Sequence, residues 1–297
     1  MPRQTLTRLA LSAILGFAVL ASEATAFAAP VQGMVAAANP LAAEAGLKVL
    51  QRGGDAVDAA VAIQATLGLV EPQSSGIGGG AFLLVYDAKT GKVTAYNGRE
   101  AAPAAATSTF FLQSDGAPIP FFDAILSGRS TGPPGAIAML GLAHSQHGKL
   151  PWKDLFDTPR RMAADGFVVS PRLAGFVAAN FPQAHAHDIL AYFTKPDGTE
   201  VKAGDLLKNP AYARTLATLA AEGPRALYEG PIAADIAGRV DKDPGGVLSV
   251  ADLKAYHAIA SPGLCRPYRV YVVCVPPRTM TPCRPEFSPR PSVMGIP

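Results

Sequence analysis

NPLAAEAGLKVLQRGGDAVDAAVAIQATLGLVEPQSSGIGGGAFLLVYDAKTGKVTAYNGREAAP, residues 39–103, is the stretch that decides the fold. It begins with Asn39 and Pro40, a capping residue followed by proline at the first helical position, and so predicts a helix start. Gly53-Gly54 ends this helix, and Asp55 caps the next one. The second helix, residues 56–70, is apolar nearly all round, which is typical of a helix that is buried on most sides.

A glycine-rich turn and a β-hairpin follow the second helix. The turn SSGIGGG spans residues 74–80, and the predicted strands 81–88 and 92–100 flank Lys89-Thr90-Gly91, which is a hairpin signal. Glycines can gather backbone N–H groups around an anion, but a dinucleotide motif or P-loop follows a strand and opens a helix. Here a helix precedes the glycines and a strand follows them, so the sequence favours a tight turn over a phosphate site.

Helices dominate the rest of the chain. Residues 103–134 are rich in Pro, Gly, Ser and Thr and are predicted to form a loop, and one more strand is predicted at 268–275. The order of helices, a hairpin, further helices and a strand makes the fold class α+β. The further helices are predicted at 136–147, 152–166, 173–180, 209–222, 231–240 and 249–256.

The composition is that of a globular protein. The 297 residues carry a formal net charge of +3, with 16% charged and 49% hydrophobic residues, which is enough apolar material for a sizeable core. The basic residues are scattered and are not interleaved with aromatic residues. We therefore expect no nucleic-acid partner.

Residues 1–26 have the pattern of a signal peptide. Arg3 and Arg8 form a positive segment, residues 9–21 are apolar but short for a bilayer span, and Ala24-Thr25-Ala26 has the small-x-small form of a cleavage site. An uncleaved membrane anchor is the weaker alternative. We expect export to the periplasm or the medium, and no stable membrane span.

The other end of the chain also differs from the middle. Cys265 and Cys274 flank one predicted strand and could pair only if the chain folded back. Both are therefore predicted to be small buried hydrophobic residues. Residues 278–297, which include Cys283, lack periodicity and are crowded with Pro and Arg. This predicts a disordered tail, or a native reading frame that is lost at Pro277.

Most candidate catalytic patterns are missing or weak. No Gly-x-Ser-x-Gly sequence supports serine hydrolase chemistry, and no Cys or His spacing fits a zinc site, so no metal is expected. His185 and His187 lie in a predicted loop, which favours solvated side chains. His144 and His147 lie beside the Gly148 helix stop, which favours a surface helix end.

Arg99 is the candidate substrate-binding residue. It ends the second strand of the hairpin, and a guanidinium in such a place can hold a carboxylate through two parallel hydrogen bonds. Glu100 would point to the opposite face of a regular strand, so it is not the expected partner. An exposed or Glu-paired surface arginine is the alternative interpretation, and it is the commoner outcome for an arginine in a single sequence.

The stretch that decides the fold resembles the N-terminal region of the γ-glutamyltransferases, which are also called glutathione hydrolases. After YNGREAAP, the segments PGAIAMLGLAHSQHGKLPW, ADGFVVSP, LYEGPIAADIA, GGVLSVADLKAYHA and PYRVYVV follow in the family's order and spacing. The similarity runs from about Met34 to Pro277. Residues 27–277 are therefore assigned as a large-subunit-like region and residues 278–297 as a divergent tail.

The resemblance implies an N-terminal-nucleophile hydrolase fold, an αββα sandwich of two stacked sheets between helical layers. Precursors in the family cleave themselves before a threonine, which then attacks the γ-glutamyl amide of glutathione, with its own α-amine as the base. Water or an amino acid takes the glutamyl group, and no metal or organic cofactor is implied. The family's carboxylate-binding arginine falls on Arg99, where it would hold the α-carboxylate of the glutamyl group.

The chain also departs from the family pattern. Family precursors are much longer, and their threonine lies in a Thr-Thr-His-x-Ser type of motif that does not occur in these 297 residues. We therefore expect no catalytic nucleophile in this chain, an incomplete sandwich, a small-subunit partner that it does not encode, and no activity on its own. A truncation or a frameshift at Pro277 would explain this pattern.

Two alternatives to a γ-glutamyltransferase remain open. A related acylase, such as a cephalosporin acylase, would keep the fold and the nucleophile but cleave another amide. Arg99 favours a substrate with an α-carboxylate near the cleaved bond. A non-catalytic truncated product is the second alternative.

Overall fold

The computed structural model describes residues 33–179 and 186–277. The chain divides into two units, Met1–Gln32 and Gly33–Pro297, and the architecture below is that of the second. The predicted signal peptide, the divergent tail with Cys283, and His185 lie outside the described residues.

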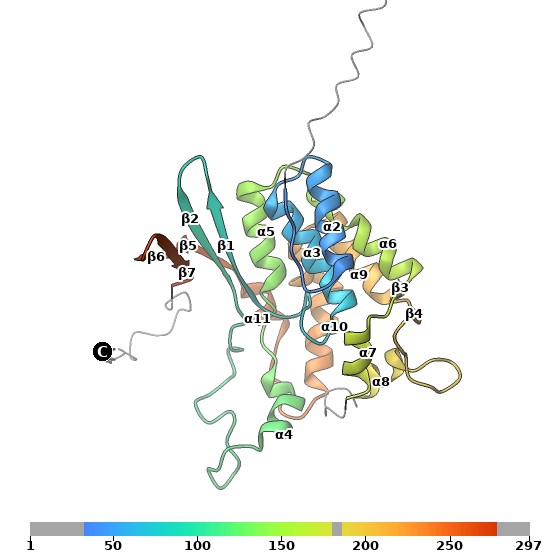
Figure 1. Ribbon diagram of the computed structural model, residues 1–297. Helices are drawn as coiled ribbons and strands as arrows, with labels where there is room; N and C mark the ends of the chain where they lie inside the picture. The colour runs from blue at the N-terminus through green and yellow to red at the C-terminus, as the bar shows by residue number, and fades with distance from the viewer. Residues whose placement is uncertain (1–32, 180–185, 278–297) are drawn as a thin grey trace, which may run out of the picture. The chain divides into compact units, whose positions relative to one another are not determined.

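Two capped helices open the described fold, as the sequence predicts (Figure 1). They are α2, Pro40–Gln51, and α3, Ala56–Val70. The Asn39 side chain accepts a hydrogen bond from the N–H of Leu41, and Asp55 forms a reciprocal capping box with Asp58. Most of α3 is buried, which confirms the prediction made from its apolar circumference.

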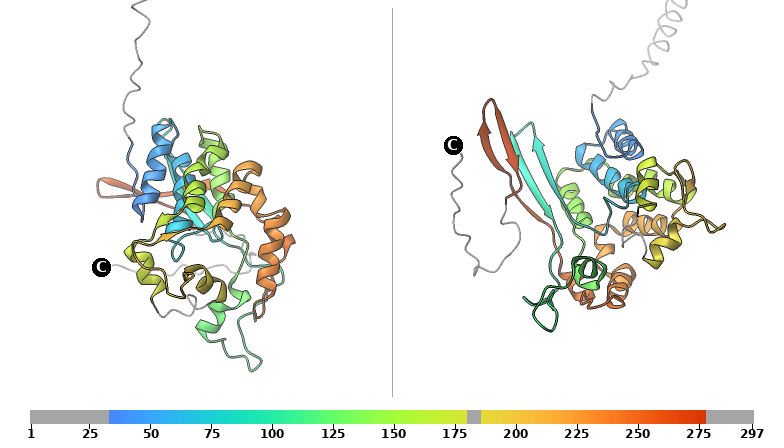
Figure 2. Two further views of the ribbon diagram at one scale, coloured as in Figure 1. Left: turned by 90° about the vertical axis from the view of Figure 1, so that its right-hand side faces the viewer. Right: turned by 60° about the horizontal axis from the view of Figure 1, so that its bottom comes forward.

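A three-stranded antiparallel sheet lies against the helices. β1, Ala81–Asp87, and β2, Lys92–Gly98, form the predicted hairpin, and β5, Ile259–Pro262, pairs with the other edge of β2. Figure 2 shows the helices on one side of this sheet, and Tyr96 of β2 is fully buried there. Among the described residues no second sheet covers the opposite face.

The remaining helices form most of the described unit. Together with the sheet, they make the fold of the described residues α+β, as predicted. The longer helices are α5, Ala136–His147; α6, Asp157–Asp165; α9, Pro210–Glu222; and α10, Gly230–Asp241. The shorter elements are α4, Phe121–Leu126; α7, Pro171–Val177; α8, His187–Phe193; α11, Val250–Ala255; the 3₁₀ helices Gly128–Ser130, Trp152–Phe156 and Pro224–Leu227; and the two-residue strands β3, Phe167–Val168, and β4, Leu206–Leu207.

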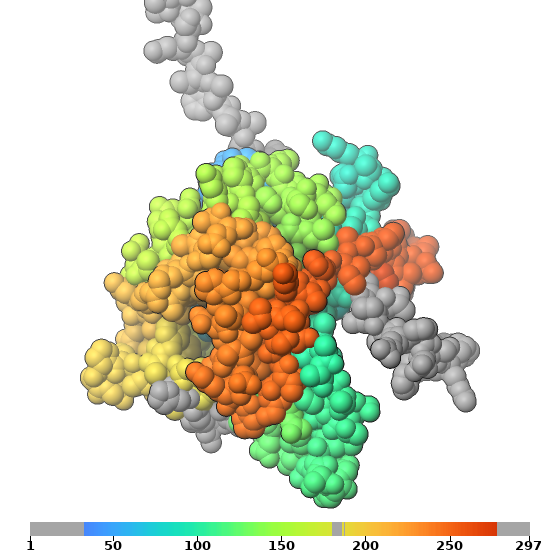
Figure 3. Space-filling model, turned by 180° about the vertical axis from the view of Figure 1, so that it is seen from behind, coloured from blue at the N-terminus to red at the C-terminus, as the bar shows by residue number. Residues whose placement is uncertain are grey.

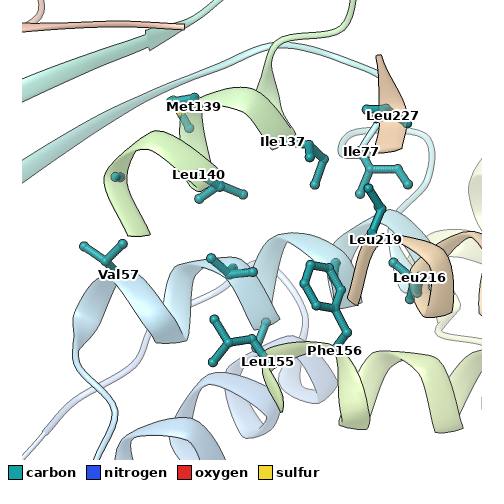
Figure 4. Packing of buried hydrophobic residues seen from close by; sticks show 14 of the residues in the cluster. Val57, Ile77, Ile137, Met139, Leu140, Leu155, Phe156, Leu216, Leu219 and Leu227 are labelled. Carbon is teal, nitrogen blue, oxygen red and sulfur yellow. The ribbon is translucent and has the colours of Figure 1, made fainter. Parts of the chain in front are cut away.

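The largest buried cluster joins α3, α5, α9 and the 3₁₀ helices Trp152–Phe156 and Pro224–Leu227 (Figure 4). Phe156 belongs to this cluster and is completely buried. Ile77 brings the glycine-rich turn into the same cluster, and Tyr96 brings in the sheet. The sheet and the helices thus share one core.

One predicted strand is wrong, and the cysteines show why. Residues 268–275 are not a single strand, because the backbone reverses at Arg269, which has φ 53°, an uncommon conformation for a residue other than glycine. The result is a hairpin of β6, Leu264–Tyr268, and β7, Tyr271–Val275, which extends beside the β1–β2 hairpin (Figure 3). Cys265 lies opposite Cys274 and forms a disulfide with it. The prediction that both are small buried hydrophobic residues is therefore wrong.

Three other local predictions need correction. The predicted loop at 103–134 contains the short helix α4, and His187 belongs to α8 rather than to a loop. The predicted helix at 152–166 is a 3₁₀ helix followed by α6. Pro159 accounts for this division, because it has no N–H to donate to the carbonyl of Leu155 and is tolerated in the first turn of a new helix.

Candidate functional site

Arg99 is held by its backbone and exposes its side chain. Its N–H donates to Asn97 Oδ1 at 2.8 Å, and its carbonyl accepts from the Tyr256 hydroxyl at 2.6 Å. The side chain, by contrast, is 51% exposed. The structure therefore fixes the place from which this side chain reaches outward, directly after the last residue of β2.

Glu100 is the ion-pair partner of Arg99, which corrects the sequence prediction. Arg99 Nη2 lies 3.3 Å from Glu100 Oε2. The prediction assumed strand alternation at this pair, but β2 ends at Gly98, so the two side chains are not obliged to point to opposite faces. An exposed pair of this kind stabilises a protein by about 0–1 kcal/mol. A substrate carboxylate can therefore compete with Glu100 for the guanidinium.

The glycine-rich turn packs beneath the Arg99–Glu100 segment. The Gly79 carbonyl accepts the N–H groups of both Gly135 and Ala136 at 3.0 Å, where α5 begins. A Cβ atom at Gly80 would lie 2.7 Å from the Glu100 carboxyl carbon and 2.8 Å from the Gly98 carbonyl oxygen. These contacts confirm the tight turn that the sequence favours. A residue larger than glycine at position 80 would displace the segment that carries Arg99.

A pair of buried tyrosines supports Arg99, and the sequence did not identify them. Tyr256 stacks on Tyr228 with the ring centroids 5.8 Å apart. The Tyr228 hydroxyl donates to the Pro134 carbonyl at 2.7 Å and accepts from the N–H of Ala138 at 3.0 Å. This pair ties the Arg99 backbone to the start of α5, so Tyr256 and Tyr228 fix the position of the Arg99 backbone.

Tyr256 makes the stability of this region depend on pH. Burial, more than the Glu100 carboxylate, raises the pKa of Tyr256 to about 12 from 10.0, while Arg99 opposes the rise. Because the folded-state pKa is the higher one, this contribution to stability is complete below pH 10 and is lost as the pH rises through 12. We expect the free energy of unfolding to fall less steeply over this range in Tyr256→Phe than in the unmodified chain. Urea denaturation at a series of pH values measures this free energy. The same dependence on pH in the two proteins would contradict the prediction.

The histidines of α5 are structural rather than solvated. His144 is 16% exposed, and its Nε2 lies 2.9 Å from the Leu150 carbonyl oxygen. His147 Nε2 lies 2.7 Å from the Tyr96 hydroxyl. α5 ends at His147 with Gly148 as its C-cap, which confirms the predicted helix end, and both histidine side chains are half-buried there. Within residues 33–179 and 186–277, no group of three or more His, Cys, Asp or Glu side chains is arranged to hold a metal ion.

Solved structures with the same fold place the chain in a class. The chain superimposes on the Helicobacter pylori γ-glutamyltranspeptidase with a TM-score of 0.77 and 31% identity, covering 82% of this chain and 69% of that one. A cephalosporin acylase from Bacillus halodurans aligns with a TM-score of 0.67 and 28% identity, covering 84% of this chain and 48% of that one. The class is that of the γ-glutamyltranspeptidases and the related acylases of the N-terminal-nucleophile hydrolases.

Sequence comparison defines the family within this class. A family model described as Gamma-glutamyltranspeptidase matches residues 42–281, and the chain belongs to this family. It is 36% identical to the glutathione hydrolase proenzyme of Bacillus subtilis (strain 168) over 248 residues, which are 82% of this chain and 41% of that protein. The Escherichia coli (strain K12) glutathione hydrolase proenzyme is also 36% identical, over 83% of this chain and 42% of that protein. The chain thus spans about two fifths of the length of these relatives.

Proposed function

We propose that this chain supplies the glutamyl-binding part of a γ-glutamyltransferase that acts on glutathione or other γ-glutamyl compounds. The observation that carries the proposal is Arg99, whose backbone is fixed by Asn97 and Tyr256 while its guanidinium is exposed. Two parallel N–H donors on one rigid plane match the two oxygens of an α-carboxylate. Membership of a family whose relatives are named glutathione hydrolases supports this substrate class.

In this proposal, Arg99 binds and orients, and a threonine outside this chain carries out the chemistry. With the α-carboxylate held by Arg99, the γ-carbonyl is presented to the threonine hydroxyl, which adds to the carbonyl carbon and loses its proton to the threonine's own α-amine. The amide C–N bond breaks, and that proton passes to the leaving amine. Water or an amino acid then attacks the ester and frees the threonine.

We also propose that a small subunit covers the outer face of the sheet and completes a sandwich. Strand alternation places Phe82, Leu84 and Tyr86 on this face, and they are 53%, 39% and 66% exposed. Soluble proteins rarely leave large side chains of this kind side by side in water. A second sheet packed on this face would bury them, as the αββα arrangement of the fold class requires.

A charge on this sheet face is expected to block assembly. We expect Leu84→Glu to weaken association with the small subunit of a relative by about tenfold or more, since burying one leucine side chain stabilises by about 1.5–3 kcal/mol. The same change should make the isolated chain more soluble. Leu47→Glu on α2 is the matched control, because Leu47 is 37% exposed, against 39% for Leu84. Analytical ultracentrifugation of both variants measures the effect, and equal association would contradict it.

The chain alone is proposed to be inactive, because its 297 residues contain no Thr-Thr-His sequence. The test is hydrolysis of γ-glutamyl-p-nitroanilide by the purified chain, with and without the rest of the large subunit and the small subunit of the B. subtilis relative. We expect release of p-nitroaniline in the mixture and none from the chain by itself. Turnover by the isolated chain that Arg99→Ala abolishes would contradict this proposal.

Export is proposed on the pattern of residues 1–26. A disulfide between Cys265 and Cys274 supports it, because disulfides persist mainly in oxidising compartments. In the described part of the chain, no helix is both long and apolar enough to cross a membrane. N-terminal sequencing of the protein from the periplasm or the medium should begin at Phe27, and a protein that retains Met1 would refute the proposal.

A further inference from the structure

A cavity of about 690 Å³ lies between α7, α8 and the turn that follows α3. Figure 1 shows α7 and α8 next to each other, and none of the residues that hold Arg99 lines the cavity. Its volume is in the range of sites for small organic molecules. The apolar side chains of its wall are Leu173, Phe176, Val177, Ile189, Leu190 and Phe193.

A buried hydrogen-bond acceptor without a donor lines this cavity. Gln73 Oε1 is buried and has no hydrogen-bond partner among the described residues. The orientation of the Gln73 amide is fixed, because its Nε2 donates a hydrogen bond to Glu71 Oε2 at 2.7 Å. The oxygen and nitrogen therefore cannot exchange places. The Glu71 carboxylate also pairs with Arg172 at 3.2 Å and accepts from Asn39 at 2.9 Å, so its position is fixed. The cavity therefore offers a fixed acceptor that awaits an N–H or O–H donor.

The Tyr192 hydroxyl is a second buried polar group on the wall. It makes no hydrogen bond of good geometry among the described residues, and the Asn209 side chain interacts with it only weakly. Burial raises the pKa of this phenol, and the nearby Asn209 side chain opposes the rise only in part. Tyr192 therefore stays neutral at physiological pH, and its oxygen can accept a further hydrogen bond. A buried polar atom left unpaired costs about 1–3 kcal/mol, which a ligand donor would recover.

The charges on the wall favour a cation. Asp188 and Glu200 line the cavity, and the described lining residues include neither Lys nor Arg. Asp188 is 3.6 Å from Arg239 and is partly neutralised by it, which leaves Glu200 as the less compensated charge. Phe176, Tyr192 and Phe193 add aromatic rings, whose faces attract cations.

We propose that this cavity binds a hydrophobic organic amine. The apolar body lies between α7 and α8, and the ammonium group donates to Gln73 Oε1 and to the Tyr192 hydroxyl oxygen. The site is distinct from the glutamyl site at Arg99, so the proposal does not depend on the proposed function.

Isothermal titration of the full chain with 2-phenylethylamine tests this proposal, with 3-phenylpropionate as the matched acid. We expect saturable one-to-one binding of the amine and at least about tenfold weaker binding of the acid, a difference of about 1.4 kcal/mol. Gln73→Leu removes the acceptor and should weaken amine binding by about tenfold. Gln51→Leu, at the exposed end of α2, should leave the affinity unchanged.

Val177→Trp is a second variant, which reduces the volume of the cavity and leaves Gln73 in the sequence, and it should abolish amine binding. Thermal unfolding of each variant shows whether it is folded before titration. The proposal is overturned if the amine does not bind, which would mean that water alone occupies the cavity. It is also overturned if the acid binds as tightly as the amine, or if a folded Val177→Trp binds the amine as well as the unmodified chain.

Discussion

Arg99→Ala is expected to lower kcat/KM for γ-glutamyl-p-nitroanilide by about a hundredfold or more in the assembled enzyme. Removing one partner of a desolvated charge pair costs about 2–5 kcal/mol, and each 1.4 kcal/mol is a factor of ten. The kcat/KM of Arg99→Lys should lie between those of the unmodified enzyme and Arg99→Ala. Lysine keeps the charge but loses the paired, planar donors. The measurement is steady-state kinetics on complexes isolated by size-exclusion chromatography, so that assembly and turnover are assessed separately.

Arg160→Ala is the matched control for Arg99→Ala. Arg160 is also exposed, at 45%, and it pairs with the carboxylate of Asp157 at 3.7 Å, but it lies on α6. We expect its replacement to leave kcat/KM unchanged. If an assembled Arg99→Ala enzyme kept the full kcat/KM, the assignment of Arg99 to the substrate carboxylate would be wrong.

Asp58→Ala is expected to have the largest effect on stability, a loss of about 3 kcal/mol or more, because each buried donor left without an acceptor costs about 1–3 kcal/mol. Asp58 is fully buried, and its Oδ2 accepts the N–H groups of Asp55 at 3.1 Å and of Lys149 and Leu150 at 3.0 Å. His144 Nε2 also lies 3.4 Å from its Oδ1. Alanine would leave these donors without an acceptor, at the junction of α3 with the end of α5.

Chemical denaturation of Asp58→Ala beside Asp157→Ala measures this effect. Asp157 is 47% exposed and pairs with Arg160, so its replacement should change the free energy of unfolding by less than about 1 kcal/mol. A similar small change for Asp58→Ala would show that the carboxylate does not hold the α3–α5 junction together.

Local signals made the first half of the fold predictable from sequence. Asn39 before Pro40 and Asp55 before an apolar run are capping patterns read within a few residues, and both helices start where expected. The β6–β7 hairpin was missed because its turn depends on a positive φ at Arg269, for which the sequence has no glycine or asparagine. The pairing of β5 with β2 was missed because it joins residues that are far apart in the chain.

The candidate site was predictable only in part, for the same reason. Arg99 was proposed from its place in a recognisable motif at the end of a strand, and its role in binding substrate stays a prediction. Tyr256, which binds its carbonyl, is 157 residues away in the sequence, and nothing local to either residue predicts the contact. Glu100 was misassigned because the end of β2 is set by packing against the glycine turn rather than by the strand pattern.

A crystal structure of this chain assembled with the small subunit of a relative, with glutamate bound, tests the central claim most directly. The account predicts two parallel hydrogen bonds of about 2.7–2.9 Å between the Arg99 guanidinium and the α-carboxylate. It also predicts a second sheet packed over Phe82, Leu84 and Tyr86. Glutamate bound elsewhere, with Arg99 still paired to Glu100 and the sheet face left in solvent, would contradict the account.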